Sequence, residues 1–351
     1  MELKHIKNDL TSPKPRVVFE ALQAIGRISK DEKPEAIAIL EKWLVHGEHM
    51  YRYTALLSLI ELGAVDHHLE QVKLMLDDAD PKIREAAVIA LGKTSKRGIT
   101  NLLIELLSSP KPEIRYQAPI SLAERGDQAA AKPLLALLER ESDVEIRVNV
   151  LAALGDLKVT RALDKIMEIA KDDTYEIVRF EAACSAGRMG ERRAAQLLAA
   201  WADHFEYGLT ACTILGDLEE QEVLGTLTKK YGKLFMSADR RLPLAATLAR
   251  LGDDRGKEYL VAKSRAFSLE TRILALDRLG RTRKEWAIAP LMEALGKKDA
   301  HTRDAALQAL EELGLSEAAT PLKRAIEGGT LGASLETDAR KVLSGLTGEQ
   351  Q

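Results

Sequence analysis

The segment DVEIRVNVLAALG at residues 143–155 decides the fold, because similar segments return along the whole chain. They include DPKIREAAVIALG at 80–92, KPEIRYQAPISL at 111–122, SLETRILALDRLG at 268–280 and DAHTRDAALQAL at 299–310. The first copy is KPRVVFEALQAIG at 14–26 and the last is ETDARKVLSGL at 336–346. Self-similarity at a fixed period predicts a repeat architecture in which each unit packs against its neighbours.

An arginine recurs at one position of this segment, and we call these residues the arginine column. Its members are Arg52, Arg84, Arg115, Arg147, Arg179, Arg241, Arg272, Arg303 and Arg340, with Val18 and Gly208 as the two exceptions. Val18 and Arg340 are ten repeats apart, so the period is about 32 residues. Mostly small residues follow three positions after the column and mostly aliphatic ones seven positions after it. This spacing predicts the apolar face of a helix.

A second amphipathic segment lies between consecutive copies, for example ITNLLIELL at 99–107 and AAKPLLALL at 130–138. Each period therefore predicts two helices joined by a turn. Residues suited to helix starts precede or open the second helix; they are Asp80, Asp143, Ser237, Ser268 and Asp299 as N-caps and Pro81 and Pro112 in the first turn. No strand pattern recurs. We expect an all-α chain of about eleven helical hairpins.

These units resemble HEAT repeats. The resemblance is carried by the A-x-P-L of the first helix (131–134 and 319–322), the Asp and Arg around the start of the second helix, and its Leu-Gly end. It implies a right-handed α-α superhelix, with second helices lining a concave groove. The short period resembles the phycobilin-lyase-like form of HEAT repeat. We expect one continuous solenoid over 1–351, with 1–28 as N-terminal cap and 316–351 as C-terminal cap.

Composition excludes several classes of protein. The chain has 351 residues, of which 46% are hydrophobic, and its 51 Lys and Arg nearly balance its 54 Asp and Glu. There is no basic block for nucleic acid. No run of 18 apolar residues occurs, so we expect no membrane insertion. The two cysteines, Cys184 and Cys212, cannot form a disulfide framework, which favours a cytoplasmic protein in which both are core residues.

Enzymatic HEAT-like families leave signatures that this chain lacks. Deoxyhypusine hydroxylases hold a di-iron site with His-Glu pairs after the arginine, and no His-Glu dipeptide occurs here. HEAT-like DNA glycosylases need a basic groove, whereas the positions two and six after the column are small and nearly neutral. No phosphate-binding glycine loop and no Ser-His-Asp spacing is present. We therefore predict no catalytic residue, no metal ligand set, no cofactor and no obligatory small molecule.

The arginine column itself is interpreted as structural, because buried charges persist only when they are paired. The resemblance to HEAT repeats implies that each arginine bonds backbone and an aspartate in an adjacent turn. Four aspartates that follow the Leu-Gly end are candidate partners: Asp127, Asp156, Asp217 and Asp253.

The predicted function is a non-catalytic scaffold or adaptor that binds another protein or peptide in the groove. Side chains that can hydrogen-bond a peptide backbone occupy the outward position of four consecutive repeats: Gln117, Asn149, Glu181 and Thr210. Tyr116, Phe180 and Tyr207 are the candidate aromatic anchors. Repeat seven, from Trp201 to Gly216, lacks the arginine and forms either a pocket or a bend. The alternative function is that of a phycobilin-lyase-like protein for chromophore attachment or isomerisation.

Overall fold

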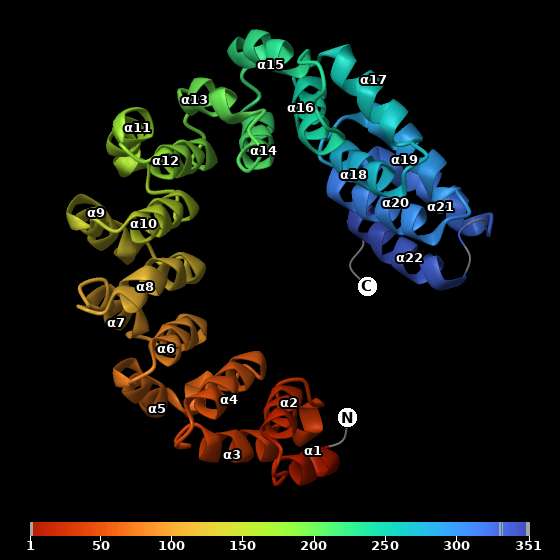
Figure 1. Cartoon of the computed structure of the whole chain (residues 1–351). Helices are drawn as coiled ribbons and strands as arrows, with labels where there is room; N and C mark the ends of the chain where they lie inside the picture. Colours follow the sequence, from red (N-terminus) through yellow and green to blue (C-terminus); the bar gives the residue numbers. More distant parts are fainter. Residues whose placement is uncertain (1–2, 330, 332, 349–351) are drawn as a thin grey trace. The chain divides into compact units, whose positions relative to one another are not determined.

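The computed structural model describes residues 3–329, 331 and 333–348, and every regular element within them is helical (Figure 1). Eleven helical hairpins follow one another, which confirms the predicted all-α fold of stacked hairpins. The first helices are α1 (Leu3–Asp9), α3 (Lys33–Trp43), α5 (Leu69–Leu74), α7 (Ile99–Leu106), α9 (Ala131–Arg140), α11 (Leu163–Asp172), α13 (Ala194–Trp201), α15 (Leu224–Tyr231), α17 (Asp254–Lys263), α19 (Ile288–Leu295) and α21 (Ala319–Glu327). The second helices are α2 (Pro15–Ile25), α4 (His49–Glu61), α6 (Pro81–Lys93), α8 (Pro112–Arg125), α10 (Val144–Asp156), α12 (Glu176–Arg188), α14 (Gly208–Leu218), α16 (Ala238–Arg250), α18 (Leu269–Gly280), α20 (Ala300–Leu313) and α22 (Ala333–Thr347).

Short 3-10 turns introduce or extend many of the first helices. They are η1 (Lys30–Glu32), η2 (Val65–His67), η3 (Met75–Asp77), η4 (Gln128–Ala130), η5 (Thr160–Ala162), η6 (Gln221–Val223), η7 (Glu285–Ala287) and η8 (Ser316–Ala318). Within the described residues, no helix combines the length and the apolar character needed to cross a membrane.

The chain forms two compact units, Met1–Ser185 and Ala186–Gln351, and the boundary falls inside α12. In each unit the second helices pack on one another in sequence and the first helices cover them on one side (Figure 1). The single continuous solenoid with caps at 1–28 and 316–351 stays a prediction. Residues 1–2, 330, 332 and 349–351 of those caps lie outside the described residues.

Hydroxyl groups connect consecutive second helices. Six positions after the arginine column, a buried serine or threonine donates to a backbone carbonyl of the preceding second helix. These hydrogen bonds run from Ser58 to Leu22 (2.8 Å), Ser121 to Val88 (3.2 Å), Ser185 to Leu151 (2.7 Å) and Thr247 to Cys212 (2.8 Å). Their regular spacing fixes the register between neighbouring repeats, because each hydroxyl reaches the carbonyl at the same relative position.

The glycine of the Leu-Gly pair has a packing role. At Gly155 an added Cβ would lie 2.9 Å from the Cα of Ser185, and at Gly92 it would lie 2.9 Å from the Cβ of Ser121. Helices α6 and α10 continue past their glycines, to Lys93 and Asp156. Glycine is therefore needed where the next second helix approaches.

The arginine column ties the repeats together at the turns. Arg52 donates to both carboxylate oxygens of Asp78, each at 2.9 Å, and to the carbonyl of His46 at 2.8 Å. Arg115 pairs in the same way with Glu141 and the carbonyl of Ser109, both at 2.8 Å. Backbone bonding together with a carboxylate of the next repeat is thus confirmed for Arg52 and Arg115, and Arg84 makes both kinds of contact as well.

The prediction that four aspartates after the Leu-Gly end pair with the column is wrong. Asp127 and Asp253 instead cap the following helical turns by accepting from the amides of Ala129 and Arg255. Asp217 pairs with Arg250, and Asp156 is the last residue of α10. The physical reason is distance: these residues follow the second helix, whereas the arginine lies in its first turn, about 20 Å away along thirteen residues.

Helix starts follow the sequence prediction closely. Asp80, Asp143, Ser268 and Asp299 each accept a hydrogen bond from an amide in the first turn, whereas Ser237 makes no such side-chain bond. Helices α6 and α8 begin at Pro81 and Pro112, as predicted. Cys184 and Cys212 are both buried, which confirms them as core residues.

Candidate functional site

The predicted groove residues of the first unit differ in accessibility. Gln117 is only 6% exposed and its amide approaches the hydroxyl of Ser121, and Phe180 is equally buried. Tyr116 and Asn149 are half-buried, and the Asn149 amide donates to the carbonyl of Tyr116 at 3.1 Å. Burial removes Gln117 and Phe180 from the side chains that a partner can reach.

Glu181, Tyr207 and Thr210 complete the predicted set. Glu181 is half-buried and accepts a hydrogen bond from Ser185 at 3.4 Å. In the second unit, the Tyr207 ring stacks on His204 with 4.5 Å between ring centroids, and Thr210 is exposed. The seven residues belong to two different units, and their forming one common surface stays a prediction.

Repeat seven replaces its missing arginine with groups from the next repeat. Arg240 donates to the carbonyl of Asp203, at 3.1 Å from Nε and 2.5 Å from Nη2. The Asp203 side chain pairs with Lys230 and Lys233. Burial by itself would raise the pKa of Asp203, but the hydrogen bonds from the two lysines outweigh it and hold that pKa below its ordinary value. Gly208 makes a close approach here, because an added Cβ would lie 3.0 Å from the carbonyl oxygen of Ala202.

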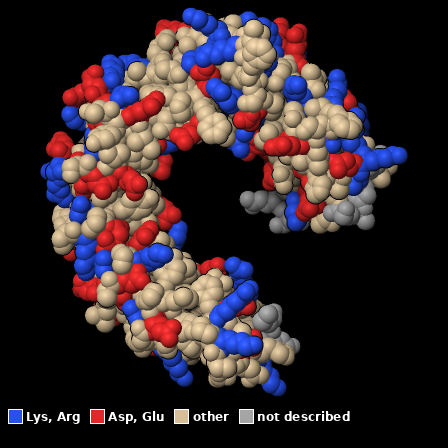
Figure 2. Space-filling model, in the orientation of Figure 1, with Lys and Arg blue, Asp and Glu red and all other residues tan. Residues whose placement is uncertain are grey.

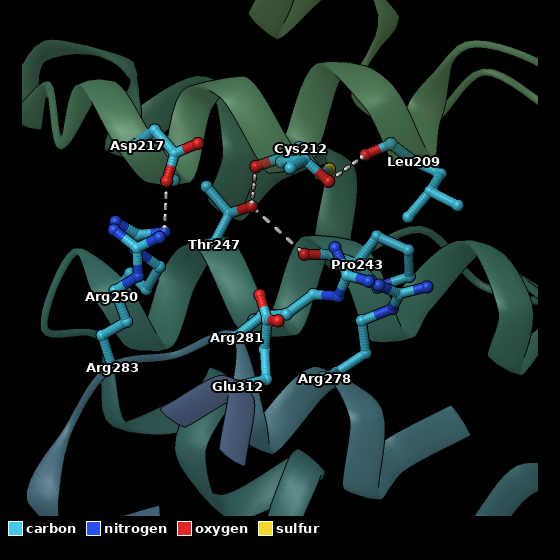
Figure 3. A pocket seen from close by; sticks show the side chains of 13 residues that line it. Leu209, Cys212, Asp217, Pro243, Thr247, Arg250, Arg278, Arg281, Arg283 and Glu312 are labelled. Carbon is cyan, nitrogen blue, oxygen red and sulfur yellow. Dashed lines mark hydrogen bonds and ion pairs between the residues drawn. The ribbon is translucent and has the colours of Figure 1, made fainter. Parts of the chain in front are cut away.

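A pocket with four arginines lies in the second unit, between α14, α16, α18 and α20 (Figure 3). It contains about 490 Å³ of space, including the part open to solvent. Its arginines are Arg250, Arg278, Arg281 and Arg283, and its carboxylates are Asp217 and Glu312. In Figure 3 the side chains of Arg278, Arg281 and Glu312 rise from the side opposite Asp217 and Cys212. We call it the arginine pocket.

The floor of the arginine pocket is buried and largely apolar. Pro243, Ala246 and Cys212 lie there together with Thr247. Burial raises the pKa of the Cys212 thiol to about 12, so the thiol is neutral and contributes no negative charge. Gly216 leaves room for a pocket arginine, since a Cβ at that position would lie 3.2 Å from Cδ of Arg250.

Sequence reasoning missed this pocket, although a signal for it exists. Arg278 occupies the position six after the arginine column, where most repeats have Ala, Ser or Thr. An arginine among small residues at a buried position is a departure that the repeat alignment makes visible.

A second feature is an edge with exposed phenylalanines. Three consecutive turns between a first and a second helix carry Phe205, Phe235 and Phe267. Phe205 is 78% exposed, and the other two are fully exposed. Because the hairpins stack in register, turns of the same kind lie along the same edge of the second unit. We call these three residues the phenylalanine edge.

Charges of both signs are interspersed on the face shown in Figure 2. In the part of the chain that the structure describes, no group of three or more His, Cys, Asp or Glu side chains is placed to hold a metal ion.

Comparisons with known proteins address the fold. A family model described as HEAT repeats matches residues 70–144, 131–209 and 258–331, which together make up more than half of the chain. A comparison with curated proteins finds no significant match.

Several solved structures share the arrangement of helices. The complex of CpcE and CpcF of phycocyanin lyase from Nostoc sp. PCC7120 matches at 20% identity with a TM-score of 0.50, over 73% of this chain and 98% of that chain. Importin beta matches at 13% identity with a TM-score of 0.52, over 98% of this chain and 56% of that chain. Kap121p bound to Pho4p matches at 10% identity with a TM-score of 0.63, over 98% and 48%. The chain thus spans about half the length of the last two, and these identities show a shared fold.

Proposed function

Because this chain belongs to the HEAT repeats, we propose that it is a scaffold or adaptor that binds another protein. A stack of hairpins offers long surfaces whose side chains vary without disturbing the core. Kap121p, which has a similar fold, is seen bound to Pho4p, so protein recognition is compatible with this arrangement of helices.

The phenylalanine edge is the observation that carries the proposal. Large apolar side chains at consecutive turns are costly to keep in water, and exposed apolar side chains that recur along one edge favour an interaction site. Aromatic residues also supply a large share of binding energy at interfaces. Phe235 adopts a positive φ of 61°, and Leu234 beside it is also exposed, so this turn presents two apolar side chains to solvent.

The groove is a second surface within the same proposal. Five of its predicted residues keep at least partial access to solvent: Tyr116, Asn149, Glu181, Tyr207 and Thr210. An amide, a carboxylate and hydroxyls can bond a peptide backbone. A partner that uses both surfaces would gain affinity from each of them.

The test compares two variants in an affinity purification followed by quantitative mass spectrometry. The edge variant carries Phe205→Ser, Phe235→Ser and Phe267→Ser, and the control carries Val45→Ser and Leu74→Ser. Val45 and Leu74 are each 76% exposed but lie outside the phenylalanine edge, after the end of α3 and at the end of α5. We expect a partner of the wild type to be weakened about tenfold or more by the edge variant and to be kept by the control. Equal recovery with both variants would remove the phenylalanine edge from the proposal.

The groove is tested with Asn149→Lys and Thr210→Lys in the same purification. Gln117 is left unchanged because a buried lysine would unfold the repeat. Loss of the partner with this variant supports the groove. Recovery of no specific partner with the wild type would contradict the scaffold function as a whole.

A second candidate function is that of a phycobilin-lyase-like protein for chromophore attachment or isomerisation. The likeness to CpcE and CpcF, which extends over 98% of that chain, is the observation that favours it. Incubation with a bilin followed by an absorbance spectrum tests it. A shifted and intensified visible band supports this function, and an unchanged spectrum contradicts it.

A further inference from the structure

Arg278 departs from a structural rule that most other repeats obey. At its position, serine and threonine bond the preceding second helix, and alanine allows close packing. In repeat nine the same position carries a guanidinium, which cannot fit between two helices in contact. Helices α16 and α18 accordingly pack less extensively than α18 and α20, and the arginine pocket lies in the space that opens.

The charge of Arg278 is poorly compensated. The residue is 9% exposed, and burial lowers the pKa of its guanidinium. Its Nη1 forms an ion pair with Asp277 at 2.9 Å, and no hydrogen bond joins the guanidinium to any other described residue. Asp277 is itself 40% exposed and also pairs with Arg281 at 3.3 Å, so one carboxylate serves two arginines. Leaving a buried cation in this state is costly unless a further anion completes it.

The other arginines add to this imbalance. Arg250 donates to Asp217 at 2.8 Å and approaches Glu219 at 3.4 Å, but its Nε is buried without a hydrogen-bond partner. Arg283 lines the rim and forms no ion pair within the described part of the chain. Of the two lining carboxylates, Asp217 is paired with Arg250 and Glu312 is exposed to water. Four guanidinium groups thus line the pocket with two lining carboxylates, Asp217 and Glu312, while Asp277 and Glu219 pair with pocket arginines from outside the lining.

We propose that the arginine pocket binds the phosphate group of a small ligand, with Arg278 at its floor and Arg281 and Arg283 at its rim. Arginine bonds phosphate through two N–H groups at once, which suits a fixed guanidinium. The guanidinium groups reach the pocket from two helices and a turn. A tetrahedral phosphate presents oxygens in more directions than a planar carboxylate does, so it matches this set of donors better. This site goes beyond the protein-binding function and does not depend on it.

The test uses Arg278→Ser in the full-length chain. Serine is the residue of the equivalent position in repeats two, four and six, so its hydroxyl is expected to bond the carbonyl of Ala245. Thermal unfolding is measured by circular dichroism with inorganic phosphate, O-phosphoserine or acetate, all at equal ionic strength. We expect phosphate at about ten times its Kd to raise the wild-type Tm by about 2–4 °C and acetate to leave it unchanged.

The variant separates a ligand site from a structural arginine. If a bound anion is needed to compensate the charge of Arg278, Arg278→Ser raises the Tm without phosphate and abolishes the phosphate-dependent rise. Arg283→Ser, on the rim, reduces that rise without changing the Tm in its absence. Arg265→Ser is the control, because Arg265 is exposed and paired with Glu293 outside the pocket. A stronger effect of O-phosphoserine identifies an ester as the ligand, and equal effects identify free phosphate.

Three results would overturn the proposal. They are a wild-type Tm that does not respond to phosphate, a response to acetate of the same size, and a phosphate response that persists in Arg278→Ser.

Discussion

At the scale of single residues, the arginines of the column and Arg278 of the arginine pocket differ in how many acceptors surround them. The column arginine Arg272 has several acceptors: it donates to the carbonyl of Ala266 at 2.7 Å and to the hydroxyl of Thr302 at 2.9 Å. Arg278 lies only six residues further along the same helix and has a single carboxylate for its charge. The same side chain therefore stabilises the fold at one position and leaves unused bonding capacity at the other.

The structural role predicts a loss of stability for Arg147→Ala. Arg147 donates to Asp173 at 2.5 Å, and the Asp173 side chain is 10% exposed. Removing the guanidinium leaves that carboxylate with less compensation, so we expect a loss of about 1–3 kcal/mol in the free energy of unfolding. Urea unfolding measures it, with the exposed Arg161→Ala as control. Unchanged stability together with lost partner binding would instead make the column a ligand site.

The carboxylates that pair with the column predict how stability depends on pH. For Asp78, Glu113, Glu141 and Asp173, burial alone would raise the pKa, but hydrogen bonds from the arginines and backbone amides outweigh it, and the pKa is lowered. A lowered pKa adds stability above the unfolded-state value, 3.8 for Asp and 4.5 for Glu, and that stability is lost as the pH falls through the folded value.

We therefore expect a free energy of unfolding that is insensitive to these groups near pH 7 and that decreases below about pH 4.5. Urea unfolding between pH 7 and pH 3 measures this dependence. Arg147→Ala should make the acid dependence shallower, because the pKa of Asp173 then moves toward its ordinary value. A loss of stability that begins above pH 6 would point to other groups.

The sequence predicts the role of the column but not its partners. A period of about 32 residues is enough to show that each arginine has a structural place. The carboxylate that a column arginine contacts must lie near the start of the second helix, where the arginine is. Asp127 and Asp253 follow the end of a second helix, so the length of that helix separates them from the arginine. Arg278 was missed because a functional departure stands out only once every repeat has been aligned at that position.

At the scale of helices, the contact between successive second helices depends on glycine facing serine or alanine. The Leu-Gly pair looks like a helix end in the sequence, because glycine often follows the last turn. In the structure Gly155 is helical and faces Ser185, and Gly280 faces Ala309. The packing partner is about 30 residues away, so local sequence patterns cannot distinguish a glycine that ends a helix from one that admits a neighbour.

This packing predicts opposite effects of the same substitution at two glycines. Gly155→Ala places a Cβ 2.9 Å from the Cα of Ser185, which forces α10 and α12 apart, and we expect a loss of about 1–3 kcal/mol. Gly225→Ala in α15 meets nothing within 4 Å, and we expect a gain of up to about 1 kcal/mol from helix propensity. Urea unfolding of both variants checks the signs. Stabilisation by Gly155→Ala would show that the close approach is not needed.

At the scale of the whole molecule, the regular and irregular repeats are unevenly distributed. Within the described residues, the exceptional Gly208, the buried Arg278 and the phenylalanine edge all belong to the second unit, Ala186–Gln351. In a repeat protein the core can be specified by a period, because every repeat meets the same neighbours. Binding surfaces are specified by departures from that period. For this reason the fold follows from the period of the sequence, whereas the arginine pocket and the phenylalanine edge, which depart from that period, do not.

Nearest-neighbour packing predicts that damage stays local. In a repeat protein, stability is approximately the sum of repeat and interface contributions, so a weakened interface lowers protection in the adjoining repeats first. Gly155→Ala weakens the α10–α12 interface. Gly280→Ala places a Cβ 2.6 Å from the carbonyl oxygen of Ala309 and so weakens the α18–α20 interface.

Hydrogen exchange followed by mass spectrometry distinguishes the two variants. We expect Gly155→Ala to increase exchange in α8, α10 and α12 and to leave α20 at its wild-type rate. We expect Gly280→Ala to increase exchange in α16, α18 and α20 and to leave α6 unchanged. The reason is that, within each unit, the described second helices pack on those of the adjoining repeats. A uniform rise in the rate of hydrogen exchange along the chain, in either variant, would mean that the eleven hairpins unfold as one cooperative body. The prediction that damage stays local would then be wrong.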